Sequence, residues 1–415
     1  MFTTWGALAG LAIAIVLIVR KVTPVYALVF GALAGGLVGG GGLADVVAAM
    51  IEGTKGMMPS VLRILASGVL VGALVKTGSA AKIADAIVSS FGTRFALAAV
   101  ALATMIVCAA GVFVDIAVIT VAPVALAVGR KAGLPVPSLL LAMVGGGKAG
   151  NVISPNPNTI AAADAFGVDL TSLMAANAIP SACALATAIL LATLLAKRCG
   201  GAAPTTAGEV AAERELPSLF SAATGPLTVV ALLALRPLCG IRIDPLVALP
   251  AGGLASVLAC GAVRKTVAYA EFGLGKVAGV AVLLIGTGTV AGIVKGSLLN
   301  RDMIALIEAL HLPSVALAPV SGVVMAGATA STTAGATLAS QTFAGTLTDA
   351  GIPALAAAAM VHAGSTVIDS LPHGSFFHAT GGAVFMSVKE RLKLIPWEAA
   401  VGLVATLAST VAGIV

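Results

Sequence analysis

The chain has 415 residues, of which 59% are hydrophobic and 10% are charged, and its formal net charge is +6. So few charged side chains cannot cover a water-soluble protein of this length, and the mean hydropathy of +1.10 agrees. Lys and Arg occur in short clusters at the ends of apolar runs, such as Arg20-Lys21, which indicates membrane anchoring and argues against nucleic-acid binding. The composition therefore predicts a helical protein that crosses a membrane several times.

Apolar runs long enough to span the hydrocarbon core, which takes about 20 residues, recur along the chain. They lie at 4–20, 24–42, 58–77, 172–196, 219–236, 245–263, 277–296 and 396–415. Two longer regions, 94–130 and 313–348, carry Gly, Pro and polar residues near their middles, and each is either a re-entrant hairpin or a pair of spans. Two more, 137–166 and 353–381, start apolar and are then interrupted, which predicts discontinuous helices.

The two halves of the chain resemble each other around a hydrophilic connection at 197–218. AGNVISPNPN (149–158) aligns with GSTVIDSLPH (364–373), and ALVKTG (73–78) aligns with GIVKGS (292–297), at a nearly constant offset. We therefore expect a first transmembrane repeat at 1–196, a cytoplasmic linker at 197–218 and a second repeat at 219–415.

Charge asymmetry predicts that the second repeat is inverted relative to the first. If Arg20-Lys21 is cytoplasmic and each half has about five spans plus a hairpin-like region, most positive clusters fall on the cytoplasmic side. These clusters are Arg130-Lys131, Lys197-Arg198, Arg264-Lys265 and Lys389/Arg391/Lys393, whereas Arg236 and Arg242 are exceptions. The expected fold is an all-α polytopic membrane protein of two inverted repeats, each with a hairpin-like region and a broken helix. Its N-terminus is expected outside the cell inner (plasma) membrane.

The first broken helix carries a lysine and a polar run. Gly145 to Gly147, Gly150, Pro155 and Pro157 cannot all lie comfortably in one helix, so we expect the break to include the glycines. Lys148 costs roughly 2.5–3.5 kcal/mol at the centre of a span, so it either attracts a substrate carboxylate or pairs with Asp115 or Asp369. The neighbouring groups that suit carboxylate and hydroxyl recognition are Asn151, Ser154, Asn156, Asn158 and Thr159, although they could equally cap and break the helix.

The second broken helix offers a carboxylate beside an imidazole. Asp369 and His373 lie four residues apart, and such a pair in a partly desolvated cavity suits a proton carrier, or else forms a structural pair. Ser365, Thr366 and His373 are further candidates for substrate binding. Matching broken helices in two repeats indicate a substrate site near the membrane midplane.

The hairpin-like regions add a carboxylate and a row of hydroxyls. Asp115 lies in the first region and is a candidate for proton or cation coupling, because a carboxylate at this depth is costly. Ser331, Thr332 and Thr333 lie in the second and either line a polar cavity or satisfy helix ends.

The sequence supports neither catalysis nor a metal site. The five cysteines are scattered without a ligand spacing, and no GxS or HExxH arrangement accompanies the His, Asp and Ser residues. We therefore expect no catalytic residues, no metal and no cofactor.

DSLPHG (369–374) resembles the D-[ST]-L-P-H signature of the gluconate:proton symporter (GntP) family, within the wider ion-transporter superfamily. SPNPN (154–158) is similar in position to a Pro-Pro-His-Pro-Gly run of that family, with Asn156 where the family has His. The resemblance implies proton-coupled uptake of a small hydroxycarboxylate such as gluconate, by a scaffold and a transport domain and often as a homodimer. It also implies roles for Asp369, Pro372 and His373, and for the residues from Pro155 to Asn158.

The sequence thus predicts a secondary active transporter that imports a small organic anion together with protons. The alternative is a sodium-coupled di- or tricarboxylate symporter, because the hydroxyls and freed carbonyls of the hairpins would suit Na⁺. An intramembrane enzyme and a channel are the other classes to be distinguished.

Overall fold

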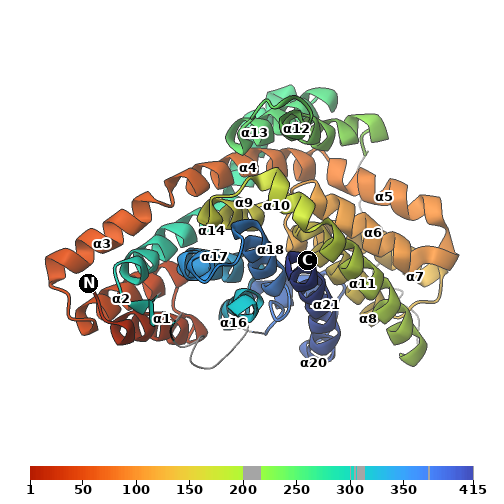
Figure 1. The fold of residues 1–415 in the computed structure, drawn as a ribbon. Coiled ribbons are helices and arrows are strands. Elements are labelled where there is room, and N and C mark those ends of the chain that lie inside the picture. Colours follow the sequence, from red (N-terminus) through yellow and green to blue (C-terminus); the bar gives the residue numbers. More distant parts are fainter. Residues whose placement is uncertain (200–215, 300, 303–304, 306–313, 373, 415) are drawn as a thin grey trace.

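The computed structural model describes residues 1–199, 216–299, 301–302, 305, 314–372 and 374–414, and this part of the chain is all-α (Figure 1). The helices of the first half are α1 (Thr4–Val19), α2 (Pro24–Val38), α3 (Leu43–Lys55), α4 (Met58–Lys76), α5 (Ser79–Phe91), α6 (Ala96–Ala109), α7 (Val114–Lys131), α8 (Val136–Asn151), α9 (Pro157–Phe166), α10 (Leu170–Ala176) and α11 (Ala178–Arg198). Those of the second half are α12 (Leu219–Cys239), α13 (Pro245–Ala259), α14 (Thr266–Lys295), α16 (Leu317–Thr329), α17 (Thr332–Asp349), α18 (Ala354–Gly364), α19 (Ser375–Ala383), α20 (Val388–Leu392) and α21 (Ile395–Ile414). Most of the predicted linker lies outside the described residues.

Most apolar runs of the sequence coincide with these helices, but the run 172–196 is divided between α10 and α11, and α14 begins eleven residues before the run 277–296. Five of the described helices are long and apolar enough to cross a membrane, or up to seven if the bent pairs α5–α6 and α9–α10 each count as one span. The segment 43–56, which lacks the length and apolarity of a span, forms the amphipathic helix α3, which packs against α14. Its buried face carries Val46 and Met50, while Asp45 and Glu52 lie on the exposed face.

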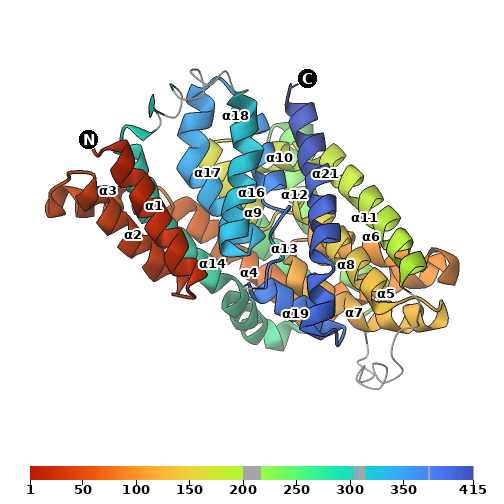
Figure 2. The ribbon, with the colours of Figure 1, turned by 90° about the horizontal axis from the view of Figure 1, so that it is seen from below.

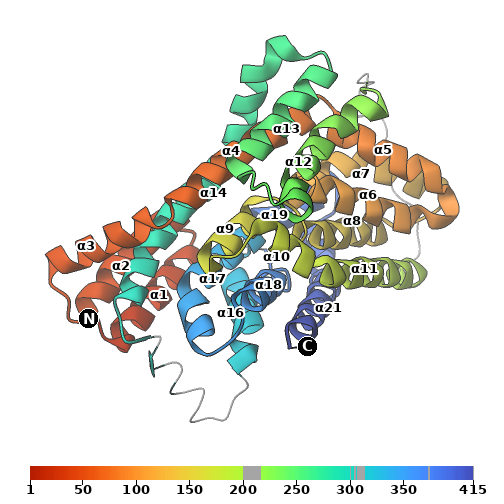
Figure 3. The ribbon, with the colours of Figure 1, turned by 45° about the horizontal axis from the view of Figure 1, so that its top comes forward.

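One group of helices is built around α14, which runs beside α3 and α4 (Figure 3). The contacts pair Gly53 with Gly288 and Gly68 with Gly273, so α14 is antiparallel to both. A Cβ on Gly273 would lie 1.7 Å from the carbonyl oxygen of Gly68, so the backbones approach to a distance that only glycine allows. α2 packs against α14, and α13 packs against α4, with α12 beside it.

The two hairpin-like regions are each a pair of helices that meet at a short turn. α6 and α7 meet where Gly111 has a φ of 107°, and α16 and α17 meet where Ala330 has a φ of 47°. With 14 and 13 residues, α6 and α16 are each about 20 Å long, shorter than the roughly 30 Å hydrocarbon core. These lengths favour re-entrant hairpins over paired full spans.

Both predicted broken helices are interrupted, but the first break begins later than expected. α8 continues through Gly145, Gly146, Gly147 and Gly150 and ends at Asn151. These glycines serve close packing against neighbouring helices. A Cβ on Gly146 would lie 2.0 Å from the Ala101 carbonyl oxygen of α6, and one on Gly145 would lie 2.4 Å from the Ala188 Cβ of α11. The break therefore comes from the residues after Asn151, and the expectation that it includes the glycines is wrong.

The described helices of the second half follow the order of the first. In each half a hairpin (α6–α7, α16–α17) precedes a broken helix (α8–α9, α18–α19) and a long final helix (α11, α21). Figure 2 shows α16, α17 and α18 together, with α21 against α18. The opposite orientation of the two halves in the membrane stays a prediction.

Candidate functional site

The first break is built by an asparagine and a proline. Asn156 is the N-cap of α9, and its Oδ1 accepts hydrogen bonds from the backbone N–H groups of Asn158 (2.9 Å) and Thr159 (3.2 Å). Its Nδ2 donates to the backbone oxygen (2.9 Å) and Oδ1 (2.7 Å) of Asn151, so one side chain joins the two half-helices. Pro157 stands at the first position of α9, where its missing N–H costs nothing.

Several of the predicted ligand groups at this break are used by the fold itself. Ser154 Oγ donates to the carbonyl oxygen of Cys108 (2.7 Å), which fastens the break to the hairpin of α6 and α7. Thr159 Oγ1 donates to Asn156 Oδ1 (3.3 Å). Ser154, Asn156 and Thr159 are fully buried. Their geometry matches the helix-breaking role that the sequence left open for them.

The second break, 365–374, uses its first hydroxyls in the same way. Ser365 Oγ donates to the Val361 carbonyl oxygen (2.9 Å), and Thr366 Oγ1 donates to that of Ala363 (2.7 Å). Both side chains are buried. His373 lies outside the described residues.

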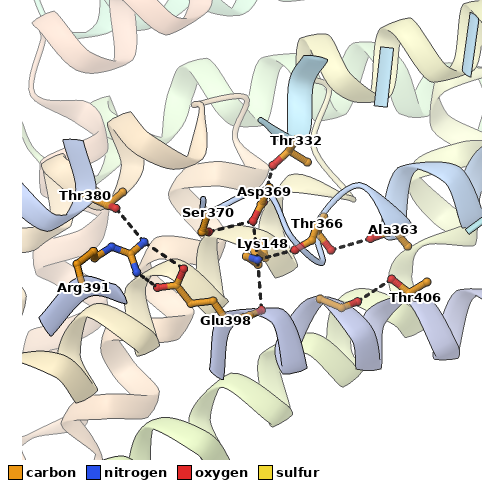
Figure 4. Close-up of polar contacts among 11 residues, drawn as sticks. Lys148, Thr332, Ala363, Thr366, Asp369, Ser370, Thr380, Arg391, Glu398 and Thr406 are labelled. Atoms are coloured by element: carbon orange, nitrogen blue, oxygen red, sulfur yellow. Dashed lines mark hydrogen bonds and ion pairs between the residues drawn. The ribbon is translucent and has the colours of Figure 1, made fainter. Parts of the chain in front are cut away.

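Lys148 and Asp369 form a buried ion pair that joins the two broken helices (Figure 4). Lys148 Nζ lies 2.7 Å from Asp369 Oδ1 and also donates to the backbone oxygens of Thr366 and of Glu398 (3.2 Å). The two side chains are only 2% and 3% exposed. All three amine protons of Lys148 thus have acceptors. Of the two possible partners that the sequence indicated, Asp115 and Asp369, the structure shows Asp369 paired with Lys148.

Asp369 is in turn held by two hydroxyls. Thr332 Oγ1 donates to its Oδ2 (2.6 Å), and Ser370 Oγ donates to its Oδ1 (3.0 Å). Thr332 begins α17, so the ion pair reaches the tip of the second hairpin through one hydrogen bond.

A second buried ion pair, Arg391–Glu398, lies beside the first (Figure 4). Arg391 Nη2 donates to Glu398 Oε2 (3.0 Å) and to Thr380 Oγ1 (3.2 Å), and the guanidinium lies 5.2 Å from the centroid of the Phe377 ring. Because Thr380 and Phe377 belong to α19, this pair fixes α19 to α20 and α21. Arg391 was expected to be a cytoplasmic anchor with Lys389 and Lys393, but it is 1% exposed, whereas those two lysines are exposed.

Between the hairpin tips lies a cavity of about 210 Å³, which we call the central cavity. The predicted residues that line it are Asp115, Asn151, Asn158, Ser331, Thr332 and Thr333. Lys276 of α14, which the sequence did not indicate, and Ser375 of α19, a polar residue of the second broken helix, also line it. Its volume is below the roughly 300–1,000 Å³ of pockets for drug-sized ligands, so it suits a small solute.

The central cavity offers one cation, one carboxylate, two amides and a set of hydroxyls. Asn151 Nδ2 and Asn158 Oδ1 are buried and have no hydrogen-bond partner among the described residues. An unpaired amide donor and an unpaired amide acceptor match a hydroxyl group, which can do both. Lys276 and Ser375 are the exposed members of the lining, which places them at the mouth of the cavity.

Arg236, one of the two predicted exceptions to the charge rule, has a carboxylate partner in the turn after α9. Arg236 of α12 pairs with Asp169, the N-cap of α10. Arg63 of α4 pairs with both Asp164 of α9 and Asp244, the N-cap of α13 (2.7 Å). The Arg63 guanidinium also holds the pKa of the Asp244 carboxyl below its ordinary value. Charge pairing thus accounts for Arg236 on a face that is otherwise poor in positive charge.

Three residues that belong to the site or support it were not predicted from the sequence, all for the same reason. Lys276, Arg391 and Glu398 each lie near the end of an apolar run, where a charge is normally an interfacial anchor. Glu398 follows Arg391 by seven residues, or about two helical turns, and this spacing could have predicted the pair. No comparable signal singled out Lys276, because its partners in the cavity come from distant parts of the chain.

Comparison with known proteins identifies the chain. The model of a family described as GntP family permease matches residues 3–415. The chain belongs to this family. An uncharacterized transporter of Haemophilus influenzae is 52% identical over 406 residues, which cover 98% of this chain and 96% of that protein. This GntP family permease is thus a multi-pass membrane transporter, and its family implies a small-molecule substrate.

The fold has a relative among solved structures. The crystal structure of the YdaH transporter of Alcanivorax borkumensis, described as having an unusual topology, aligns with a TM-score of 0.64. The alignment covers 90% of this chain and 88% of YdaH at 19% sequence identity, so the likeness concerns the fold alone.

Proposed function

We propose that this permease is a secondary active symporter that imports a small hydroxycarboxylate, such as gluconate, together with protons. It would act in the inner (plasma) membrane as a homodimer, with its N-terminus outside and the linker 197–218 in the cytoplasm. The observation that carries the proposal is the central cavity, whose lining combines Lys276 with the carboxylate of Asp115, two amides and several hydroxyls.

The lining of the central cavity matches the groups of a hydroxycarboxylate. The ammonium of Lys276 suits the substrate carboxylate, since a hydrogen bond to a charged group contributes about 1.5–3 kcal/mol. Asn151, Asn158 and Thr333 supply donors and acceptors for hydroxyl groups. The buried Lys148 would then support the site through Asp369 and Thr332 without touching the substrate.

Charge balance in the cavity favours proton coupling. With Lys276 charged and Asp115 ionised, the pair is neutral, and a monovalent anion that enters adds one uncompensated negative charge. A proton on Asp115 removes this excess, so anion and proton enter more favourably together than apart. Asp115 is the better candidate for the coupled proton because it lines the cavity, whereas Asp369 already has Lys148, Thr332 and Ser370 as partners.

Sodium coupling is the second candidate, and one arrangement favours it. Ser331, Thr332 and Thr333 lie in the same small cavity as Asp115, so oxygen atoms of two hairpin tips surround one space. Sodium would neutralise Asp115 as a proton does, and would take oxygen ligands.

Transport into proteoliposomes decides between these proposals. We expect labelled gluconate to accumulate under an inward proton gradient without sodium, and carboxylates of three to six carbons with hydroxyl groups to raise the Tm of the purified protein. If accumulation requires sodium, proton coupling is wrong and sodium coupling takes its place. If no carboxylate accumulates or raises the Tm, the proposed substrate class is wrong.

A further inference from the structure

A second cavity shares three helices, α9, α14 and α17, with the central cavity. This cavity, which we call the peripheral cavity, has a volume of about 700 Å³ between α3, α9, α14 and α17. Its polar lining includes Glu52, Lys295, Gln341, Thr342 and Asp349. Like the central cavity, it combines a cation, carboxylates and uncharged polar groups.

Three helices run from one cavity to the other. α9 contributes Asn158 to the central cavity and Ala165 to the peripheral one, and α14 contributes Lys276 and Ala291 in the same way. On α17 the corresponding residues are Thr333 and Ala344, which are eleven residues or about 16 Å apart. We call the contact between α9, α14 and α17 over this distance the seam.

The seam contains two buried hydroxyls with no partner. From Thr333 to Ala344, Thr337 and Ser340 follow at intervals of four and three residues, so they lie on the same face of α17. Both are fully buried, and neither Thr337 Oγ1 nor Ser340 Oγ has a hydrogen-bond partner within the described chain. Burying an unpaired hydroxyl costs roughly 1–3 kcal/mol.

These hydroxyls, like Thr342 Oγ1 and Ser409 Oγ, differ from most buried hydroxyls among the described residues. Thr104, Thr287 and Thr406 each donate to a backbone carbonyl oxygen of their own helix, the usual arrangement for a hydroxyl in a membrane helix. Thr337 and Ser340 leave this bond unmade. Opposite them, α9 presents the small residues Ala161 and Ala162 on the face that joins Asn158 to Ala165, so little side-chain volume closes the seam.

We propose that the seam is the closed part of the permeation path between the central and the peripheral cavity. When the seam opens, Thr337 and Ser340 bind the hydroxyl groups of the solute. The inference rests on the proposed transport function and names the route between the two cavities. When α17 separates from α9 and α14, the unpaired hydroxyls gain a solute or water as partner, and their burial cost is relieved. The chemical class that fits is a small polyhydroxy carboxylate.

Thiol labelling in membranes tests the route. In a variant whose five native cysteines are replaced, Ser340→Cys is compared with Ala339→Cys. Both positions are buried, but Ala339 lies on the face of α17 that carries Gly335, which packs against Ala326 of α16. We expect a membrane-impermeant methanethiosulfonate to label Ser340→Cys at least tenfold faster. Equal labelling rates would overturn the inference, whether or not gluconate is the substrate.

A second pair of measurements separates the seam from the central cavity. Ser340→Val should reduce gluconate uptake at least tenfold, while the rise in Tm caused by gluconate remains, because the central cavity is intact. Unchanged uptake by Ser340→Val would contradict a role in permeation. If gluconate raises no Tm in the unmodified protein, the proposed substrate is wrong, and the labelling ratio alone decides the route.

Discussion

The ammonium of Lys148 lies 2.7 Å from the carboxylate of Asp369, and this buried pair links the broken helix of the first half to that of the second. Neither charge reaches the central cavity directly. Thr332 connects them, since it donates to Asp369 and also lines the cavity. The pair therefore sets the relative position of the two breaks.

Removing one partner of this pair should destabilise the protein strongly. Lys148→Met leaves Asp369 buried without a counter-charge, so we expect the free energy of unfolding to fall by about 3–5 kcal/mol. Lys148→Met combined with Asp369→Leu should recover part of this loss without restoring uptake. Thermal unfolding in detergent measures both effects, with the exposed Lys131→Met as control. A single variant as stable as the control would contradict the structural role.

Lys276 should govern substrate affinity. Lys276→Gln removes a charged hydrogen bond of about 1.5–3 kcal/mol, so the KM for gluconate should rise about 10- to 100-fold with little change in Tm. Lys265→Gln makes the same charge change at an exposed position before α14 and serves as the control. Equal KM values for the two variants would place the anion elsewhere.

Asp115 should separate coupling from binding. Asp115→Asn cannot exchange a proton, so we expect exchange of labelled for unlabelled gluconate to persist while accumulation driven by a proton gradient falls at least tenfold. The exposed Asp45→Asn is the matched control. Normal accumulation by Asp115→Asn would assign the coupled charge to another group.

The Arg391–Glu398 pair should matter for stability more than its position near the chain end suggests. Arg391→Met leaves Glu398 buried without its partner and frees Thr380 of α19, for an expected loss of about 3–5 kcal/mol. Lys389→Met, two residues away and exposed, should be nearly neutral. Chemical unfolding followed by circular dichroism compares them, and equal stability of the two variants would show that the pair contributes nothing net.

The loop carboxylate Asp244 should make stability depend on acid pH. Because the hydrogen bond from Arg63 lowers the pKa of Asp244 from 3.8, this carboxylate stabilises the fold above that value and loses its contribution as pH falls through its lower folded pKa. We expect Asp244→Asn to lower the Tm at neutral pH and to lose less Tm than the unmodified protein below about pH 4. Parallel acid profiles would exclude this contribution.

The positions of the membrane helices could be predicted because an apolar run of spanning length has few alternatives in lipid. Polar α3 was not expected as a helix, since its two buried residues, Val46 and Met50, give a weak signal. The glycines of α8 were misinterpreted because close packing and helix breaking both select glycine. Only the partner surface, here the backbone of α6, distinguishes them.

Individual residues of the site could be predicted from the sequence, but most of their partners could not. Asp115 was selected because a carboxylate at depth is costly, Asn158 for its hydrogen-bonding groups and Thr333 as part of a hydroxyl-rich turn, and the structure gathers them in one cavity. The choice between Asp115 and Asp369 as partner of Lys148 could not be made from spacing, since both are far away in the chain. His373 stays a prediction.

The length of α14 has a mechanical consequence. Its 30 residues extend about 45 Å, half as far again as the hydrocarbon core of roughly 30 Å. Such a helix must lean by roughly 50° from the bilayer normal or project from the bilayer. Because α17 packs along α14, any sliding between them on an inclined path carries the hairpin tip sideways as well as in depth. The inclined α14 thus couples movement of the hairpin along the bilayer normal to movement in the plane of the bilayer.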